Sequence, residues 1–552
     1  MDSRLRVGLL LDSVFLPSWA FTAIERIVCS NYAELVLVVL NQSLPNRASV
    51  WTTLWQGHWL YRVFNAIDEK LFLHSANALA LVDPSEILSN VSVLEIKPID
   101  ENGKQHFCSS DLRRIGAYQL DILIKIGFGN LCGDVLSVAT HGVWTYRWGD
   151  SRKIEDGLTG FWEAVRGWPE TGAALQQLRG DPKAELTLFE SWFSTYPYSP
   201  ARSRNSILWA ASSFLPRQVE HLHQVGAEEF FRQRMKNVRE NPGRLESNNI
   251  PSNLMVLWIT IKLAFRDLLE IYRRSFCRER WELLFDFSAE SEKDIYTFKK
   301  ISPPRDRFWA DPHIVYKEPN YYIFVEEYCY RKGRGHISVI EMDREGNYTQ
   351  PIPVLYEDCH LSFPFVFDWM GHYYMIPESS GKKTIDLYEC VQFPDQWQHK
   401  ITLMKDVRAV DTTLIYTQGK WWLFTSIAEQ EAAAPQVELF LFSSRELFTD
   451  QWNPHPMNPI VSDVKKARGA GRIFLRDGKW IRPSQDCSIT YGYGFDLNEI
   501  IELSEGTYRE RTVTSIQPDP TKRILGTHTY ANQCDLTVVD ALTRPPIWAN
   551  GR

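Results

Sequence analysis

The stretch DPHIVYKEPNYYIFVEE, residues 311–327, contains two short runs of β-branched and aromatic residues on either side of Pro319-Asn320. Such runs favour strands, and proline with asparagine favours a turn between them. The pattern returns as SFPFVFDWMGHYYMIPE at 362–378, DTTLIYTQGKWWLFTS at 411–426 and AGRIFLRDGKWIRPSQ at 470–485. The copies begin 51, 49 and 59 residues apart, and repeats of this length that contain several strands are typical of a β-propeller.

A fifth copy is predicted around Gly526-Thr527-His528, with the apolar run 536–540 after it. Residues 281–287 read as one more strand that would join this last copy and close the ring. We therefore predict an all-β domain, a five-bladed β-propeller, over residues 281–552.

The first part of the chain follows a different pattern. Apolar runs at 5–11, 34–40, 91–96 and 121–126 are separated by segments with helical spacing, as at 17–28. This alternation predicts an α/β domain with a parallel sheet over residues 1–185, and residues 186–280 are predicted to be a helical connecting segment. No GxGxxG or GxxxxGK[ST] loop follows these runs, so a nucleotide-binding fold of the Rossmann type lacks its main support.

Composition narrows the function classes. The net charge of −7 argues against a nucleic-acid groove as the main surface. The nine cysteines stand singly with no CxxC pair, so we expect neither a disulfide framework nor a metal site. The apolar run after residue 4 reads as a buried strand rather than a signal peptide, and we expect a cytoplasmic protein.

The segment 254–280 is the most apolar part of the second quarter and contains several arginines. Lys262 and Arg266 interrupt it before the length of roughly 20 apolar residues that a bilayer span needs. We expect a helix packed against a neighbour. The alternative is a basic amphipathic helix that lies on an anionic membrane as a peripheral contact.

A propeller places equivalent positions of its blades in rings around the axis. The predicted rings are Asp311, Ser362, Asp411, Ala470 and His528 at the first-strand starts, and Glu326, Glu378, Ser426, and Gln485 or Asp486 at the second-strand ends. Paired carboxylates in unlike environments cleave or transfer glycosidic bonds, so Asp311, Glu378 and Asp411 are the predicted catalytic residues.

The remaining polar ring residues are predicted to bind substrate. Arg468 and Arg482 would supply fixed donors for a phosphate or carboxylate. The alternatives are structural: an aspartate that caps a turn, a solvated Glu326, and arginines paired with Asp486. The predicted binding residues of this half are Glu326, Arg468, Arg482, Gln485, Asp486 and His528.

Four motifs in order, FWADPHI, MIPESS, VDTTLI and IRPSQDC, resemble the N-terminal domain of glucosamine inositolphosphorylceramide transferases. That domain is itself similar to five-bladed glycosidases of the arabinanase and levansucrase type. The resemblance implies a carbohydrate-related pocket in which Asp311 matches the channel aspartate that serves glycosidases as base or nucleophile. Ser362 stands where that pattern expects an acidic residue, so hydrolysis is not implied.

DILIKIGFGN, THGVWTYRWGD and WPETGAALQQL, between residues 121 and 178, resemble the core of the formyltransferase fold shared with methionyl-tRNA formyltransferase. The resemblance implies that His141 shuttles a proton, with Arg147 in the following loop, and that 10-formyltetrahydrofolate is a possible cofactor. Ala139 replaces the family asparagine, which removes the donor that stabilises the oxyanion. A rebuilt site would use Thr140 or Asn130 as donor, and Trp144 would stack on a ligand.

We therefore predict a transferase that moves a formyl or other acyl group onto an amino sugar or related amine, with a carbohydrate-binding propeller. The predicted partner is a small molecule or carbohydrate, with no nucleic acid. Two alternatives stay open: a glycosidase-like or glycosyltransferase-like propeller beside a degenerate formyltransferase domain, and a binding or scaffold protein without catalysis.

Overall fold

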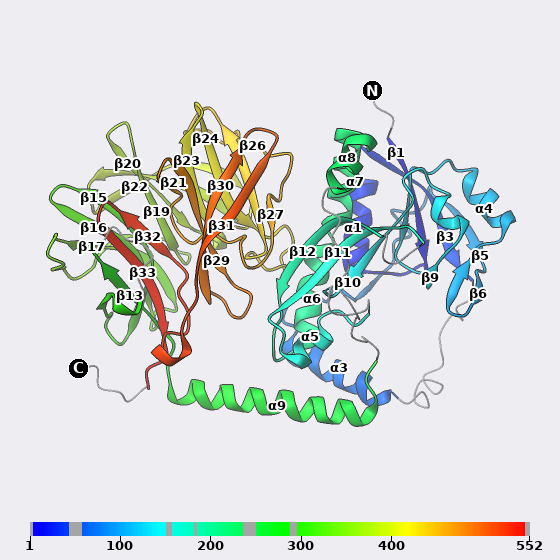
Figure 1. Cartoon of the computed structure of the whole chain (residues 1–552), viewed down its shortest axis with the longest axis horizontal. Coiled ribbons are helices and arrows are strands. Elements are labelled where there is room, and N and C mark those ends of the chain that lie inside the picture. The colour runs from blue at the N-terminus through cyan, green and yellow to red at the C-terminus, as the bar shows by residue number, and fades with distance from the viewer. Residues whose placement is uncertain are drawn as a thin grey trace. The chain divides into compact units, whose positions relative to one another are not determined.

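The computed structural model describes residues 4–42, 58–150, 157–180, 185–235, 250–287 and 295–546. The chain divides into two compact units. The first comprises residues 1–266 with 430–433, and the second comprises residues 267–429 and 434–552. Figure 1 shows the helix-rich first unit in blue to green and the strand-rich second unit in green to red.

The first unit is built on a seven-stranded mixed sheet, so the predicted parallel sheet is confirmed. Its central strands pair in parallel, and the last two are antiparallel. Apolar side chains on both faces bury these strands between helices, as expected for a parallel sheet. In spatial order the strands are β12 (Leu186–Ser194), β11 (Glu170–Leu178), β10 (Val143–Trp148), β8 (Ile122–Lys125), β1 (Leu5–Leu11), β3 (Ala33–Asn41) and β5 (Ser92–Ile96).

The predicted helical connecting segment, 186–280, begins with a strand instead. Residues 186–194 contain aromatic and threonine residues that favour a strand, and they form the edge strand β12 rather than a helix. The helices that follow it, α6 to α8, contact the first unit's sheet and α1. The helices of this unit are α1 (Ser18–Val28), α3 (Trp59–Phe72), α4 (Ser109–Gly116), α5 (Phe161–Arg166), α6 (Pro200–Ala211), α7 (Phe214–Val225) and α8 (Ala227–Met235).

Helix α9 (Asn253–Phe276) is the longest helix in Figure 1. Only Val256, Ile259 and Leu263 of its apolar side chains are buried, so the expected packing against a neighbour holds for one narrow face. Among the described residues, no helix combines the length and the apolar character that crossing a bilayer requires.

The second unit contains five successive antiparallel sheets. In chain order the first four are β15 (Arg307–Lys317) to β18 (Ile352–Leu355), β19 (Ser362–Trp369) to β22 (Gln396–Lys405), β23 (Ala409–Thr417) to β27 (Val461–Ser462), and β28 (Phe474–Arg476) to β31 (Tyr508–Ile516). The fifth joins both ends of the unit, because β13 (Arg280–Asp286) pairs with β33 (Leu536–Thr543). Its outer strands are β14 (Lys299–Ile301) and β32 (Tyr530–Gln533).

Each sheet shares an apolar cluster with the next one. Phe324 and Met375 belong to one cluster between the first two sheets, and Phe365 and Trp421 to the next. Further clusters join the third to the fourth sheet, the fourth to the fifth, and the fifth to the first. The burial of these apolar faces is the main source of stability in this unit.

Gly471 lies where the fourth sheet meets β32, and its replacement tests this contact. Its φ is +134°, and a Cβ there would collide with the carbonyl oxygen of Tyr530, whose N–H donates to the carbonyl of Ala470 at 2.7 Å. We expect Gly471→Ala to lower the free energy of unfolding by at least about 3 kcal/mol, measured by thermal or denaturant unfolding.

The matched control is Gly478→Ala in an open turn. Its φ is +74° with no atom near the added Cβ, so only the backbone strain of about 1 kcal/mol is expected. Equal losses in the two variants would contradict a close contact at Gly471.

Candidate active site

Three sheets of the second unit have a β-bulge near the start of their first strand, in β15, β19 and β23. Asp311, Phe363 and Asp411 each have φ between +43° and +51°, and each lies within a register shift of its strand pair. Residues other than glycine rarely adopt this left-handed backbone conformation. Its occurrence at three equivalent positions therefore marks a functional region.

The bulge corrects the predicted ring. Ser362 pairs with Glu378 as Ala310 pairs with Glu326, so Ser362 lies one residue before the position equivalent to Asp311. Phe363 occupies that position and is buried. The same bulge occurs in both sheets, so the predicted ring was one residue out of register in the second sheet, where Pro364 is the counterpart of Pro312.

Asp311 is held by two neighbouring sheets. Its carboxylate accepts from the Thr529 hydroxyl at 2.8 Å and from the backbone N–H of Phe363 at 3.2 Å. Its own N–H donates to the Asp540 carboxylate at 3.1 Å. Burial raises the pKa of Asp311, and the charge of His528 opposes the rise.

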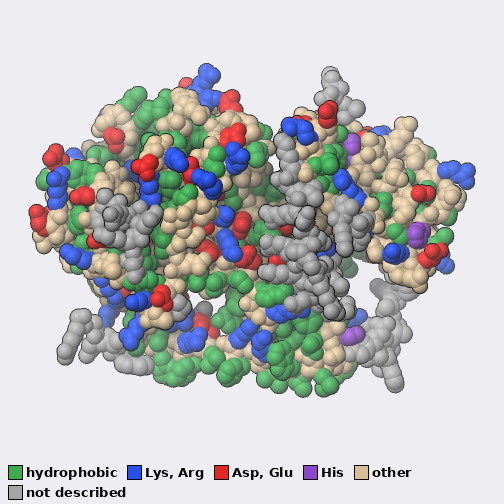
Figure 2. All heavy atoms as spheres, viewed as in Figure 1, with side chains coloured by type: hydrophobic (Ala, Val, Ile, Leu, Met, Phe, Trp, Pro, Cys, Tyr) green, Lys and Arg blue, Asp and Glu red, His purple; other side chains and the backbone are tan. Residues whose placement is uncertain are grey.

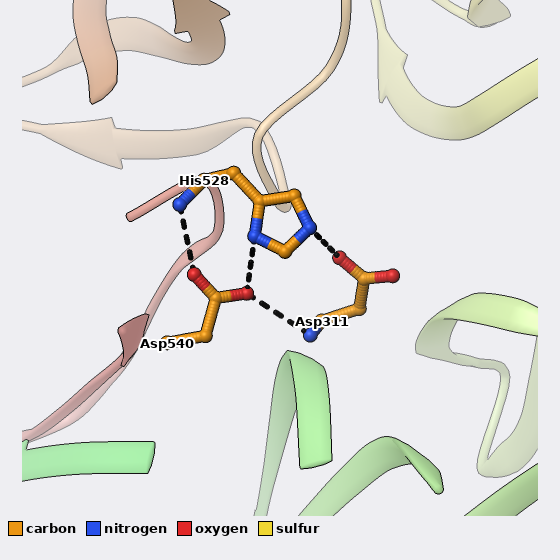
Figure 3. Close-up of side chains that lie close together, drawn as sticks. All are labelled: Asp311, His528 and Asp540. Atoms are coloured by element: carbon orange, nitrogen blue, oxygen red, sulfur yellow. Dashed lines mark hydrogen bonds and ion pairs between the residues drawn. The ribbon is translucent and has the colours of Figure 1, made fainter. Parts of the chain in front are cut away.

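His528 lies between two carboxylates (Figure 3). Its Nδ1 is 2.6 Å from Asp540 Oδ2 and its Nε2 is 3.3 Å from Asp311 Oδ1. Burial alone would lower the pKa of His528, but Asp540 and Asp311 outweigh it and hold the pKa above its ordinary value. The two flanking carboxyl groups thus favour the protonated form of the His528 ring and fix its orientation beside Asp311.

The same three residues could offer ligand atoms to a metal ion, because the atoms lie within 4.8 Å of one another. The donor set fits a cation poorly, since Asp540 already accepts from the backbone N–H groups of His528 and Thr529. The short distance between His528 Nδ1 and Asp540 also leaves no room for an ion between them.

A second group centres on Arg468. Its Nε donates to Asp411 at 2.5 Å, and its Nη2 lies 3.2 Å from both Asp411 and Glu378. Gln485 donates to Asp411 at 3.0 Å. The Asp411 side chain is 1% exposed, whereas Glu378 and Arg468 are each 10% exposed, so these two present the reactive edge of the group.

Two glutamates of the site favour the protonated form. Burial raises the pKa of Glu378 to about 8, with Arg468 opposing the rise and Asp411 adding to it. Burial also raises the pKa of Glu326 well above its ordinary value, and the charges of Asp311 and Glu378 add to it. His360 Nε2 lies 3.5 Å from Glu326. At neutral pH Glu378 therefore keeps its proton, and the pKa of Glu326 shifts in the same direction.

Tyr491 is an aromatic residue of the site that the sequence analysis missed. Its ring lies 4.9 Å from the Arg468 guanidinium carbon and 5.3 Å from the His528 ring, yet the residue is 46% exposed. Thr529 and Asp540 were missed too. The signals were a charged residue inside the apolar run LTVVDALT and the glycine-flanked aromatics of YGYG.

Two predicted residues lie outside this cluster. Arg482 is fully buried and donates to Glu510 at 2.7 Å from two nitrogens, so its partner is neither a ligand nor Asp486. Asp486 accepts from the Ser488 N–H and hydroxyl, which caps the turn after β29 (Lys479–Asp486). Arg482 is therefore held by a protein carboxylate, but not by the Asp486 that the structural alternative named, and Asp486 caps a turn.

His141 lies at the edge of the first unit's sheet where ligands are least expected. It precedes β10, and its N–H donates to the carbonyl of Asp121, just before the parallel strand β8. Ligands of open α/β sheets bind at the opposite, carboxyl edge. Burial lowers the pKa of His141, and its ring contacts Phe231 at 5.8 Å. This placement corrects the expectation of a catalytic histidine at a strand's end.

The other predicted residues of the first unit differ in their surroundings, and Thr140 is exposed. Trp144 is fully buried and stacks on Phe230, so it cannot stack on a ligand. The Thr140 N–H donates to the carbonyl of Leu120 at 3.0 Å. Arg147 lies within β10 and is partly buried. These residues belong to the first unit and the carboxylate cluster to the second.

Replacing Glu378 tests its protonation. Between about pH 4.5 and pH 8 the unfolded chain releases the proton that folded Glu378 keeps, so the contribution of this group to stability falls as pH rises. A glutamine at this position would stay neutral at every pH. We expect the free energy of unfolding of Glu378→Gln, relative to that of the unaltered protein, to rise by more than about 1 kcal/mol between the two ends of this pH range. Denaturant unfolding at both pH values measures it.

The control is Glu345→Gln at an exposed turn, for which no such change is expected. A stability difference for Glu378→Gln that stays constant with pH would show that folded Glu378 is ionised.

Comparisons with known proteins support the sequence resemblance of the second half. The family described as glucosamine inositolphosphorylceramide transferase 1, N-terminal, matches residues 297–532. Glucosamine inositolphosphorylceramide transferase 1 of Arabidopsis thaliana is 35% identical over 208 residues, and that of Oryza sativa subsp. japonica is 32% identical over 206. Each alignment covers 37% of this chain and 27% of the relative, so the chain matches about a quarter of the relatives' length.

Several solved structures show low overall similarity to this chain. A Podospora anserina α-L-arabinofuranosidase is 12% identical, with 44% of this chain and 95% of that chain covered and a TM-score of 0.34. An exo-1,5-α-L-arabinanase from a bovine ruminal metagenomic library is 15% identical, covering 44% and 94%, with a TM-score of 0.31. Glycinamide ribonucleotide transformylase 1 of Symbiobacterium toebii is 12% identical, covering 40% and 88%, with a TM-score of 0.28.

Proposed function

We propose that this protein is a carbohydrate transferase whose active site is the carboxylate cluster of the second unit. The observation that carries the proposal is the pair formed by Glu378 and Asp411. Both carboxyl groups contact Arg468, and burial raises the pKa of Glu378 to about 8. Glycosyl transfer uses one acid that keeps its proton and a second carboxyl group that acts as base. Glu378 is the proposed acid, and Asp311, whose charge adds to the rise in the Glu378 pKa, is the proposed base.

The five sheets of the second unit are, in this proposal, the blades of a five-bladed β-propeller. The pairing of β13 with β33 and the apolar clusters between successive sheets support it. The bulges at Asp311 and Asp411 would then direct both carboxylates toward the axis, where first strands meet.

The proposed reaction includes two proton transfers, one to the departing oxygen and one from the acceptor hydroxyl. The bond from the anomeric carbon to the departing oxygen breaks, and Glu378 gives its proton to that oxygen. The oxygen of the acceptor hydroxyl bonds to the anomeric carbon. Asp311, oriented by His528 and Thr529, takes the proton of that hydroxyl. Arg468 holds Asp411 in place and faces a phosphate or hydroxyl of the substrate.

The substrate class comes from the relatives. Their name pairs glucosamine with inositolphosphorylceramide. By similarity, we propose an amino sugar as the transferred group and an inositol phosphate headgroup as the acceptor. The formyl transfer that the sequence predicts draws no support from the described residues, because His141 lies at the amino edge of its sheet.

Paired glycosides test the role of Glu378. For Glu378→Gln we expect kcat/KM on a methyl glucosaminide to fall at least about 100-fold, because an alkoxide needs a proton to leave. On the 2,4-dinitrophenyl glucosaminide the loss should stay below about tenfold, since dinitrophenolate leaves unprotonated. Asp311→Asn should lower both, and unfolding curves exclude misfolding.

His141→Ala in the first unit is the control and should leave both rates unchanged. Loss of activity in His141→Ala alone would favour acyl transfer in the first unit. Calorimetric sugar binding without turnover by the unaltered protein would favour a binding protein.

Tyr491→Ala tests the mouth of the site. An exposed ring over Arg468 can stack on a sugar, so we expect KM to rise about three- to tenfold with little change in kcat or unfolding temperature. Tyr348→Ala serves as the control, because this ring has similar exposure and follows the turn after β17 (Arg334–Met342). An unchanged KM would remove Tyr491 from the binding site.

A further inference from the structure

Helix α9 leaves a continuous apolar face uncovered. Six large apolar side chains follow one another at intervals of three or four residues, which aligns them along one side of the helix. Each is between 55% and 83% exposed. They gather as a green band over α9 in Figure 2. The six are Leu254, Trp258, Ile261, Phe265, Leu268 and Tyr272.

The opposite face of α9 is fixed to the first unit. Val256, Ile259 and Leu263 are buried in a cluster with Phe161 of α5. Lys262 and Arg266 of α9 also donate to the backbone carbonyls of α5, at 2.7 Å and 3.0 Å. The helix therefore cannot roll to bury its apolar face without breaking these contacts.

Helix α3 presents a second stripe of the same kind. Its exposed apolar residues recur every four positions, and its first turn adjoins α9 because the Leu60 N–H donates to the Asn253 side chain. Both helices pack on the same apolar cluster. The α3 stripe comprises Trp59, Val63, Ile67 and Leu71, which are 43% to 59% exposed.

The charges on the two helices select the occupant of this surface. Among the described side chains of α3 and α9, the exposed charged ones are Arg62, Lys70 and Arg273, all basic. The acidic side chains of both helices are at least partly buried: Asp68, Glu69, Asp267 and Glu270. Apolar side chains fringed by basic ones match the headgroup region of an anionic bilayer.

We propose that α9, together with α3, is an in-plane membrane-binding surface that takes an anionic lipid bilayer. A second copy of the chain fits less well, because a two-fold contact through these stripes would bring the same basic fringes together. The long basic side chains can lie along the apolar face with their charged ends at the phosphates. The surface does not depend on the chemistry proposed for the second unit.

Vesicle flotation with the full chain tests this inference. We expect the unaltered protein to float with vesicles of phosphatidylcholine and phosphatidylglycerol, and to bind phosphatidylcholine alone more weakly. Ile261→Asp with Phe265→Asp should lower partitioning at least about tenfold. Neutralising Arg62, Lys70 and Arg273 with glutamine should lower anionic binding about fivefold for each charge removed and weaken its salt dependence.

Met370→Asp is the matched control, because Met370 is an 81% exposed apolar residue in a turn of the second unit. It should bind vesicles like the unaltered protein, and circular dichroism with thermal unfolding verifies that all variants fold. Absence of vesicle binding by the unaltered protein would overturn the proposal. So would full binding by the double variant, or a dimer in solution that the double variant dissociates while vesicles stay unbound.

Discussion

The left-handed bulge at the start of the first strands is the constraint on which the site depends. At Asp311, Phe363 and Asp411 the backbone adopts a conformation that costs an ordinary residue about 1–2 kcal/mol. Hydrogen bonds from the backbone N–H groups of the bulges to neighbouring carboxylates offset this cost. The Asp540 carboxylate accepts from the bulge N–H of Asp311, and the Asp311 carboxylate accepts from that of Phe363. Each acid therefore holds the next sheet in position while it is itself held.

This coupling explains why the charges of the site are distributed unevenly. Asp311 and Asp411 are enclosed by donors, namely Thr529 and the Phe363 N–H on one side and Arg468 and Gln485 on the other. Glu326 and Glu378 come from second strands and meet fewer donors, so burial dominates their protonation. A protonated and an ionised carboxyl can thus coexist within one small volume.

The repeat of the second half and the alternation of strands and helices in the first part could be predicted from the sequence, because periodicity is a local property. Asp311, Glu378, Asp411, Arg468 and Gln485 were all predicted to face one region, and the structure brings them together. Three features depend on contacts between distant parts of the chain and could not be predicted from local sequence. The strand pairing places Phe363 rather than Ser362 at the position equivalent to Asp311, Arg482 is buried against Glu510, and Asp540 reaches the site from a strand paired with the unit's opposite end.

The fifth sheet also determines when the site can form during synthesis. Arg280 and Thr543, which are 263 positions apart, pair across it, and His528, Thr529 and Asp540 come from the later segment. A ribosome adding about 5–20 residues per second makes β13 at least several seconds before β33. Until then the edge of β13 lacks its partner and Asp311 lacks its histidine. A nascent chain therefore carries an unpaired strand edge, a target for chaperones, and the site cannot react before the unit is fully made.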